Sequence, residues 1–364
     1  MRIDELDTPV LLIDSDALER NLQRLAKITE AAGIDYRPHT KTHKSATIAR
    51  MQVEAGAIGV CCAKLGEAEV MAANEIDNIL ITTPVVGESK IGRLMTARNQ
   101  AAIAVVADNK QNIEMLGSIA QLSGTKLDVF VEVDVGQGRC GVPPGPEAAI
   151  LAVMIDSHPW LNFSGLQGYQ GKIQMLVDVE ERQMQTIEGL NKLSKAIGEV
   201  EKKGLTVNIR TGGGTGTLPF DADRGLLTEI QAGSYVFMDS RYGGINWPDA
   251  NTPPFEQALY ILTSVVSKPA PDRVVLDAGL KAASSDHGPP MIENGVGQNY
   301  AFGGDEHGIL TMTGGEHVPW EVEDKLRLIP SHCDTTVNLY DQYMVFHDKN
   351  VIDVWPIEAR GRVQ

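Results

Sequence analysis

Residues 127–141, LDVFVEVDVGQGRCG, give the clearest indication of the fold. The first part, Leu127–Asp134, is rich in apolar and β-branched residues, as expected for a strand that is buried on both faces. The three glycines that follow surround Arg139, which indicates a backbone folded tightly with one guanidinium group presented. The segment therefore predicts a buried strand that ends in a polar, glycine-rich loop.

The same kind of apolar strand recurs on both sides of this segment, with helix-length stretches between most of the strands. Before the first of them, Val10–Ile13 is apolar, and a helix is expected from Asp14 or Ser15 to about Ala32. Repeated strand–helix units imply a parallel sheet, and eight of them favour a closed (β/α)8 barrel of the TIM type. An open doubly wound sheet is the alternative. The expected strands are Asp35–His39, Ile58–Cys62, Asn78–Thr82, Ala102–Ala107, Leu127–Asp134, Phe163–Gly168, Thr206–Arg210 and Glu229–Ala232.

The pattern changes after about residue 248. Asn251-Thr-Pro-Pro254 is a break, and helical periodicity is weak beyond it. We expect a barrel over residues 9–248 and a mostly β second domain over residues 249–364. Residues 1–8 are expected to belong to this second domain. The strands expected in this second domain are Ala258–Ser267, Arg273–Asp277, Leu326–Ile329, Gln342–Phe346 and Val351–Trp355.

Composition narrows the class of protein. The 364 residues are 43% hydrophobic and 22% charged, which suits a large folded core. The formal net charge of −16 argues against a nucleic-acid partner, and an anionic ligand would need a local binding arrangement. Four scattered cysteines suggest no disulfide framework, and Cys61 and Cys62 are expected to be buried thiols. With no apolar signal region and no membrane-length apolar run, we expect a cytoplasmic protein without a membrane partner.

Barrel enzymes place their chemistry at the carboxyl ends of the strands. The first strand ends in Arg37-Pro-His-Thr-Lys-Thr-His-Lys44. Such a crowd of basic groups would lower the pKa of a lysine amine, and a lysine tuned in this way can form a Schiff base. A solvated basic loop is the alternative interpretation.

Further strand ends supply an aromatic hydroxyl and two glycine-rich loops. Tyr169 lies between glycines after the sixth strand, Thr211–Thr217 follows the seventh, and Ala232–Tyr235 follows the eighth. Backbone N–H groups of glycine-rich loops converge on anions, and barrels often bind phosphate after strands seven and eight. A lysine, an arginine, a tyrosine and a phosphate cradle at one mouth together favour pyridoxal 5'-phosphate (PLP).

The second domain contains Pro330-Ser-His-Cys-Asp-Thr-Thr-Val-Asn338. His332 and Asp334 are two residues apart, so on an extended segment both side chains would point to one side and Cys333 would point away. An imidazole nitrogen and a carboxylate oxygen suit a divalent cation, although a hydrogen-bonded core histidine is an open alternative. Asp305-Glu-His-Gly308 is expected to be a hairpin turn.

These motifs together resemble the D-threonine aldolase family of fold-type III PLP enzymes, which combine an alanine-racemase-like barrel with a D-serine-dehydratase-like C-terminal domain. The resemblance extends from Thr8 to Gly361. The segments that carry it are Arg37–Lys44, Glu132–Val142, Gln231–Asp239, Val275–Lys281 and Ser331–Asn338.

The resemblance implies roles for individual residues. Lys41 would form the Schiff base with PLP, Arg139 would contact the cofactor ring, and Tyr169 would line the cofactor and substrate site. His332 and Asp334 would bind the cation, with manganese, cobalt or magnesium favoured over zinc. The phosphate would be held around Gly214, Thr215, Gly233 and Ser234. A homodimer with shared active sites is also implied, in which the β domain of one subunit closes the barrel mouth of the other.

The implied activity is cleavage of D-3-hydroxy-amino acids to glycine and an aldehyde. A metal-assisted dehydratase giving a 2-keto acid and ammonia is the main alternative, but such enzymes typically carry a His-x-Cys pair where this chain has His332 and Asp334. An amino-acid racemase and a PLP-binding protein without turnover are more remote alternatives. The sequence departs from the family at Gln170 and Met175, which replace frequent histidines, and at Ala63, which replaces a frequent glutamine.

Overall fold

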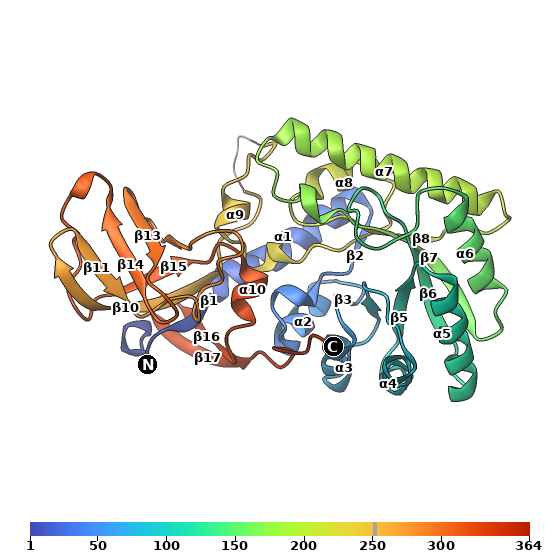
Figure 1. Ribbon diagram of the computed structural model, residues 1–364, viewed down its shortest axis with the longest axis horizontal. Coiled ribbons are helices and arrows are strands. Elements are labelled where there is room, and N and C mark those ends of the chain that lie inside the picture. The colour runs from blue at the N-terminus through green and yellow to red at the C-terminus, as the bar shows by residue number, and fades with distance from the viewer. Residues whose placement is uncertain (250–252) are drawn as a thin grey trace.

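The computed structural model of the protein describes residues 1–249 and 253–364, so Asn251 and Thr252 of the expected break lie outside the described residues. Figure 1 shows two lobes, one rich in helices and one built of strands. The helical lobe contains eight strands in the order β2-β9-β8-β7-β6-β5-β4-β3. These strands are β2 (Asp35–Tyr36), β3 (Val60–Cys62), β4 (Ile79–Ile81), β5 (Ile103–Ala107), β6 (Leu127–Glu132), β7 (Leu161–Gly168), β8 (Ile209–Gly212) and β9 (Glu229–Ile230).

All neighbours in this sheet are parallel. Its two end strands also meet, because His39 forms a parallel bridge with Cys61 and the Cys61 amide donates to the Pro38 carbonyl at 2.8 Å. The sheet therefore curls into a ring, which confirms the barrel and excludes the open doubly wound sheet. The seventh expected strand, Thr206–Arg210, is displaced, since β8 begins at Ile209.

Helices cover the outside of the ring. Their ends follow the sequence: the Asp14 side chain accepts from the amides of Asp16 and Ala17 at the start of α1, and Gly33 ends it with a φ of 66°. The helix expected to end near Ala32 is thereby confirmed. The helices of this lobe are α1 (Ser15–Ala32), α2 (Ala46–Glu54), α3 (Leu65–Ala73), α4 (Glu88–Arg98), α5 (Lys110–Ser123), α6 (Pro146–Asp156), α7 (Val179–Glu201), α8 (Leu218–Arg224) and α9 (Ser240–Gly243).

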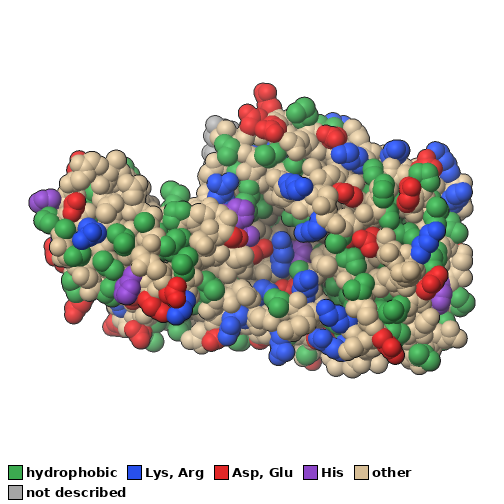
Figure 2. Space-filling model, in the orientation of Figure 1, with side chains coloured by type: hydrophobic (Ala, Val, Ile, Leu, Met, Phe, Trp, Pro, Cys, Tyr) green, Lys and Arg blue, Asp and Glu red, His purple; other side chains and the backbone are tan. Residues whose placement is uncertain are grey.

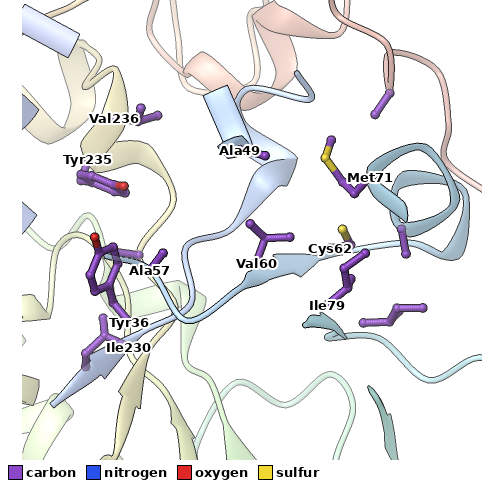
Figure 3. Close-up of a cluster of buried hydrophobic side chains, with 14 of the residues drawn as sticks. Tyr36, Ala49, Ala57, Val60, Cys62, Met71, Ile79, Ile230, Tyr235 and Val236 are labelled. Carbon is purple, nitrogen blue, oxygen red and sulfur yellow. The ribbon is translucent and has the colours of Figure 1, made fainter. Parts of the chain in front are cut away.

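Two apolar clusters stabilise the barrel lobe. The larger one fills the space between the strands and the helices, where residues such as Val60, Cys62 and Met71 pack together (Figure 3), and it continues into the second lobe. A separate cluster takes one side chain from each of β3, β4, β5 and β6, and alternation along these strands places it inside the ring. Its members are Cys61, Leu80, Val106 and Phe130. The expected burial of Cys61 and Cys62 is confirmed.

The second lobe is a nine-stranded sheet with the path β13-β14-β11-β10-β1-β16-β17, and β15 pairs with both β10 and β12. Its strands are β1 (Val10–Asp14), β10 (Leu259–Ala270), β11 (Arg273–Leu276), β12 (Met291–Ile292), β13 (Gln298–Phe302), β14 (Gly308–Met312), β15 (Lys325–Ile329), β16 (Gln342–His347) and β17 (Asn350–Pro356). One short helix, α10 (Cys333–Val337), lies where this lobe faces the barrel (Figure 1).

The pairing of β1 differs from the expected domain boundary. We assigned residues 9–14 to the barrel, but β1 is antiparallel to β10 and parallel to β16. The chain therefore begins in the second lobe, enters the barrel through α1 and returns to the second lobe at β10. After β17 the C-terminal tail runs back to the barrel, where the Gly66 amide donates to the Gln364 carbonyl at 2.9 Å.

Among residues 1–249 and 253–364, no helix combines the length and the apolar character needed to cross a membrane.

Candidate active site

The loop after β2 holds Lys41 in a short 3-10 turn, Thr40–Thr42. Its conformation is fixed by the buried His39, whose Nδ1 accepts from the Lys41 amide at 3.4 Å and whose Nε2 lies 3.0 Å from Thr82 Oγ1. The second lobe also binds this loop, because the Tyr343 hydroxyl donates to the His43 carbonyl at 2.6 Å. Lys41 is thus presented from a rigid turn at the carboxyl end of the barrel.

The electrostatic surroundings of Lys41 differ from our expectation. Burial, and then the charge of Lys41, lower the pKa of His39 well below its ordinary value, and burial lowers the pKa of His43 to about 4. Both imidazoles are therefore neutral at pH 7. Burial also lowers the pKa of Lys41, but the Asp334 carboxylate, with Oδ2 3.4 Å from Lys41 Nζ, outweighs it and the pKa is raised. The prediction of a lysine pKa lowered by a crowd of cations is wrong. The two histidines are neutral, Arg37 and Lys44 are paired with buried carboxylates of the barrel, and a carboxylate from the other lobe faces the amine.

Lys41, Arg139 and Tyr169 line one cavity of about 70 Å³ at the barrel mouth. The Arg139 guanidinium carbon lies 5.9 Å from the centroid of the Tyr169 ring. Figure 2 shows a hollow between the two lobes in which basic, acidic and imidazole side chains gather. The other residues that line the cavity are His39, Ala63, Thr82, Thr83, Gln167 and Gln231.

Buried amides at the strand ends form the wall of this cavity. Gln231 Nε2 donates to Gln167 Oε1 at 3.0 Å and to Thr211 Oγ1 at 2.8 Å, and Gln167 Nε2 donates to the Thr82 carbonyl at 3.2 Å. These two glutamines are not among the site residues predicted from the sequence. Their signal is a polar residue at the carboxyl end of a strand, which a parallel barrel places at the mouth.

The two glycine-rich loops lie side by side, as expected for a phosphate cradle. The Tyr235 amide donates to Thr215 Oγ1 at 3.0 Å, which joins the loop after β8 to the loop after β9. A Cβ atom at Gly233 would lie 2.8 Å from Thr42 Oγ1, so only glycine fits there. The Thr42 hydroxyl is buried beside this glycine and lies near the Asp334 carboxylate. Glycine backbone that no side chain can cover is the kind of surface that binds a phosphate.

Buried side chains behind the first loop fix its shape. Gln174 Oε1 accepts from the Gly216 amide at 3.0 Å, and Asp221 Oδ2 accepts from the Thr217 hydroxyl at 2.5 Å. Arg182, fully buried, donates from Nε to the Gly216 carbonyl at 3.0 Å. The cradle formed by Gly214, Thr215, Gly233 and Ser234 is therefore rigid before any ligand arrives. Together with the Lys41 amine, it fits PLP.

His332 and Asp334 face each other across the same mouth. His332 Nε2 lies 3.9 Å from Asp334 Oδ2. Since both ligand types bind a divalent cation at about 2.1 Å, two ligands of one ion lie at most about 4.2 Å apart, and the pair fits one cation. The expected extended segment is wrong, because His332 is the N-cap residue of α10 and Asp334 lies in its first turn. Cys333 points away into the core, as expected.

The Asp334 carboxylate is ionised, as a metal ligand must be. Burial raises its pKa, but the neighbouring Lys41 ammonium group outweighs burial, and the pKa of Asp334 is lowered to about 2. The side chain is only 12% exposed, so these interactions are poorly screened. The Cys333 amide anchors the turn by donating to Asp239 Oδ2 at 3.1 Å.

Other residues singled out in the sequence lie elsewhere. Gln170 lines a separate cavity together with Gln174 and Asp221, and Met175 packs against the apolar core. Glu306 and His307 lie on the exposed turn between β13 and β14, where Glu306 pairs with Lys281 at 2.5 Å, which confirms the expected hairpin. Asp286 and His287 were not predicted from the sequence, and their ligand atoms lie within 4.8 Å of those of His332.

Comparisons with known proteins agree with this architecture. The family model "Alanine racemase, N-terminal domain" matches residues 13–241, and "Putative serine dehydratase domain" matches residues 258–346. The chain is 39% identical over 363 residues to a 3-hydroxy-D-aspartate aldolase from Paracoccus denitrificans (strain Pd 1222), covering 98% of this chain and 93% of the relative. It is 40% identical over 356 residues to a D-threonine aldolase from Arthrobacter sp, with the same coverage.

The solved structures agree. D-threonine aldolase from Filomicrobium marinum superposes with a TM-score of 0.96 at 35% identity, covering 100% of this chain and 98% of that one. A dehydratase relative is more distant, since the D-threo-3-hydroxyaspartate dehydratase from Delftia sp. (strain HT23) is 26% identical. The chain belongs to the D-threonine aldolase family, whose members join an alanine-racemase-type barrel to a serine-dehydratase-type domain.

Proposed function

We propose that the protein is a PLP- and divalent-metal-dependent lyase that cleaves the carbon–carbon bond of D-3-hydroxy-amino acids of the D-threonine type, giving glycine and an aldehyde. One observation carries this proposal: Lys41 Nζ and Asp334 Oδ2 lie 3.4 Å apart at one mouth. An amine suited to carry PLP and a carboxylate suited to hold a cation can therefore act on the same small molecule.

The protein residues would bind and orient the reactants. Lys41 would hold PLP covalently, Thr42, Gly214, Thr215, Gly233 and Ser234 would hold its phosphate, and Arg139 would lie against its ring, near Tyr169. When bound, the cofactor supplies an electron sink for the broken bond and the cation supplies a Lewis acid for the hydroxyl oxygen. His332 and Asp334 would hold that cation on the lobe opposite the barrel. The substrate would thus be held by its amino group at the cofactor and by its hydroxyl oxygen at the cation.

The group that accepts the proton of the substrate hydroxyl is not supplied by Gln170 or Met175, the two positions where the family often has histidine. Gln170 has no titratable group, and Met175 packs against the core. Lys41 Nζ is the basic nitrogen that lies beside Asp334, and once it is free of the cofactor it can hold a proton at that place. We therefore assign proton transfer within the site to Lys41 and to water.

The choice of cation follows from the donor set. One imidazole nitrogen and one carboxylate oxygen leave most of the coordination shell to water, which suits manganese, cobalt or magnesium. The nearby thiol does not contribute, because burial, and then the charge of Asp239, raise the pKa of Cys333 well above its ordinary value. We also propose a homodimer in which the β lobe of one subunit closes the barrel mouth of the other.

The test is a product assay on purified protein with D-threonine, with and without EDTA. The cofactor absorbance, at about 410–420 nm, is recorded in parallel. We expect acetaldehyde and glycine, loss of turnover with EDTA, and retention of the band. Lys41→Ala should lose both the band and the activity. Formation of 2-oxobutanoate would instead assign the protein to the dehydratases, and the absence of a band in the wild type would contradict the proposal.

A further inference from the structure

A polar cluster lies on the side of His332 that faces away from Asp334. The carboxylate of Asp286, in the loop that follows β11, accepts a hydrogen bond from His332 Nδ1 at 2.6 Å. Its other oxygen accepts from the hydroxyls of Ser284 at 2.8 Å and Thr335 at 3.0 Å. The carboxylate is thus fixed by two hydroxyl groups before it contacts the imidazole.

The contact between Asp286 and His332 is a hydrogen bond and not a shared cation. Two neighbouring ligands of one octahedral ion, each at about 2.1 Å from it, lie about 3.0 Å apart. A separation of 2.6 Å is too short for that arrangement and is that of a short hydrogen bond from an N–H group to a carboxylate. The cation position next to His332 is therefore on its other ring nitrogen.

The hydrogen bond determines which nitrogen of His332 is free. When Nδ1 carries the proton and donates to Asp286, Nε2 presents its lone pair toward Asp334, 3.9 Å away. Both the tautomer and the ring orientation needed for metal binding are set in this way. Metal-binding histidines commonly depend on such an outer carboxylate.

We propose that Asp286 is a positioning residue that orients His332 for the cation, and this inference rests on the proposed metal site of His332 and Asp334. His287 is a neighbour of the same cluster, with its ring edge-on to that of His332 at a centroid distance of 4.7 Å. Its Nε2 lies 3.8 Å from Asp286 Oδ2. A cation held by Asp286, His287 and His332 is the competing arrangement, and the experiment separates the two.

The experiment measures the affinity of PLP-loaded protein for manganese by the electron paramagnetic resonance signal of free Mn²⁺. We expect Asp286→Ala to weaken the affinity about 10- to 100-fold. Asp286→Asn keeps an oxygen that can accept from Nδ1–H, so its loss should be smaller. Asp305→Ala removes an exposed carboxylate of the same lobe, 69% exposed, and should leave the affinity unchanged. The cofactor band should be the same in all three variants.

A second readout separates positioning from general damage to the fold. At saturating manganese, Asp286→Ala should recover most of the wild-type kcat, whereas a misfolded variant would not. If Asp286→Ala does not fold, Asp286→Asn and Thr335→Ala replace it, with a weakened manganese affinity expected for both.

Asp334→Asn distinguishes the ways in which the inference can fail. If Asp334→Asn loses manganese and the Asp286 variants do not, the inference is overturned and the proposed function stands. If neither position affects the affinity, the proposed metal site itself is wrong. If the Asp286 variants lose manganese and Asp334→Asn does not, the cation lies among Asp286, His287 and His332. That outcome overturns both the positioning role of Asp286 and the proposed metal site of His332 and Asp334.

Discussion

Glu132, at the end of β6, shows how the barrel mouth alters the chemistry of one residue. The side chain is 4% exposed, and its Oε2 has no hydrogen-bond partner in the described part of the chain. Burial, and then the charge of Asp108, raise the pKa of this carboxyl from 4.5 to about 7, although the charge of Arg139 opposes the shift. Glu132 is thus partly protonated at neutral pH.

A pH dependence of stability follows from this shift. Between the unfolded pKa of 4.5 and the folded pKa of about 7, the Glu132 carboxyl binds more protons in the folded protein than in the unfolded chain. The free energy of unfolding therefore falls as the pH rises through this range. We expect Glu132→Gln to make the cofactor-free protein more stable than wild type at about pH 8, by about 1–3 kcal/mol, and to make little difference at about pH 5. Urea unfolding at several pH values measures this difference.

The control for that experiment is Glu114→Gln on α5. Glu114 is exposed, so this substitution removes a carboxylate without touching the buried site. Its unfolding free energy should follow that of the wild type at every pH. If Glu132→Gln also runs parallel to the wild type, Glu132 is not the group whose protonation changes.

Among the secondary-structure elements, the strands were predictable where a short run of apolar and β-branched residues determines them. The expected strand Leu127–Asp134 is found as Leu127–Glu132, because an apolar β-branched run has few alternatives inside a barrel. The glycine loops after β8 and β9 also lie together, as strand order requires.

The pairing of strands that lie far apart in the sequence was not predictable in the same way. β1 has the same apolar pattern as a barrel strand, but its partner β16 lies far along the chain. Likewise His332 and Asp334 face each other from the first turn of α10, where an extended segment was expected.

The loop after β9 gives a prediction about cofactor binding. In Gly233→Ala the new methyl group would lie 2.8 Å from Thr42 Oγ1 and 3.2 Å from His39 Cβ, so the phosphate cradle must open. We expect the affinity for PLP to fall by about tenfold or more, which corresponds to at least about 1.4 kcal/mol. An absorbance titration of the cofactor-free protein measures the affinity.

Gly198→Ala in α7 is the matched control. A Cβ atom there meets nothing within 4 Å, so the substitution should leave the affinity for PLP unchanged. Because alanine replaces glycine inside the last turn of α7, the variant should also be more stable, by up to about 0.5–1 kcal/mol. Wild-type affinity in Gly233→Ala would show that the cradle tolerates a side chain at this position.

At the scale of the whole molecule, the candidate site belongs to neither lobe alone. Lys41 comes from the barrel and Asp334 from the β lobe, and the second lobe also binds the lysine loop through Tyr343. The sequence motifs indicated each of these candidate residues separately. They could not indicate that the carboxylate expected to bind metal would be the partner of the lysine, since that contact depends on how the two lobes pack.

This contact predicts a coupling between the cofactor and the cation. In the cofactor-free protein, the Lys41 ammonium group lies against the Asp334 carboxylate and competes with a cation for it. When Lys41 holds PLP, that competitor is removed. We therefore expect manganese to bind about 5- to 150-fold more tightly to the PLP-loaded protein than to the cofactor-free protein, the usual range for coupled sites. Titrations of both forms with manganese measure the ratio.

Thermodynamic reciprocity gives this prediction an internal check. Manganese must strengthen the binding of PLP by the same factor by which PLP strengthens the binding of manganese. Cofactor-free Lys41→Ala has no ammonium group at this place, so it should bind manganese about as tightly as the PLP-loaded wild type. Equal manganese affinities in the two wild-type forms would show that the ion pair does not couple the sites. Coupling that persists in Lys41→Ala, with PLP bound through its phosphate alone, would instead assign it to a change in how the two lobes pack.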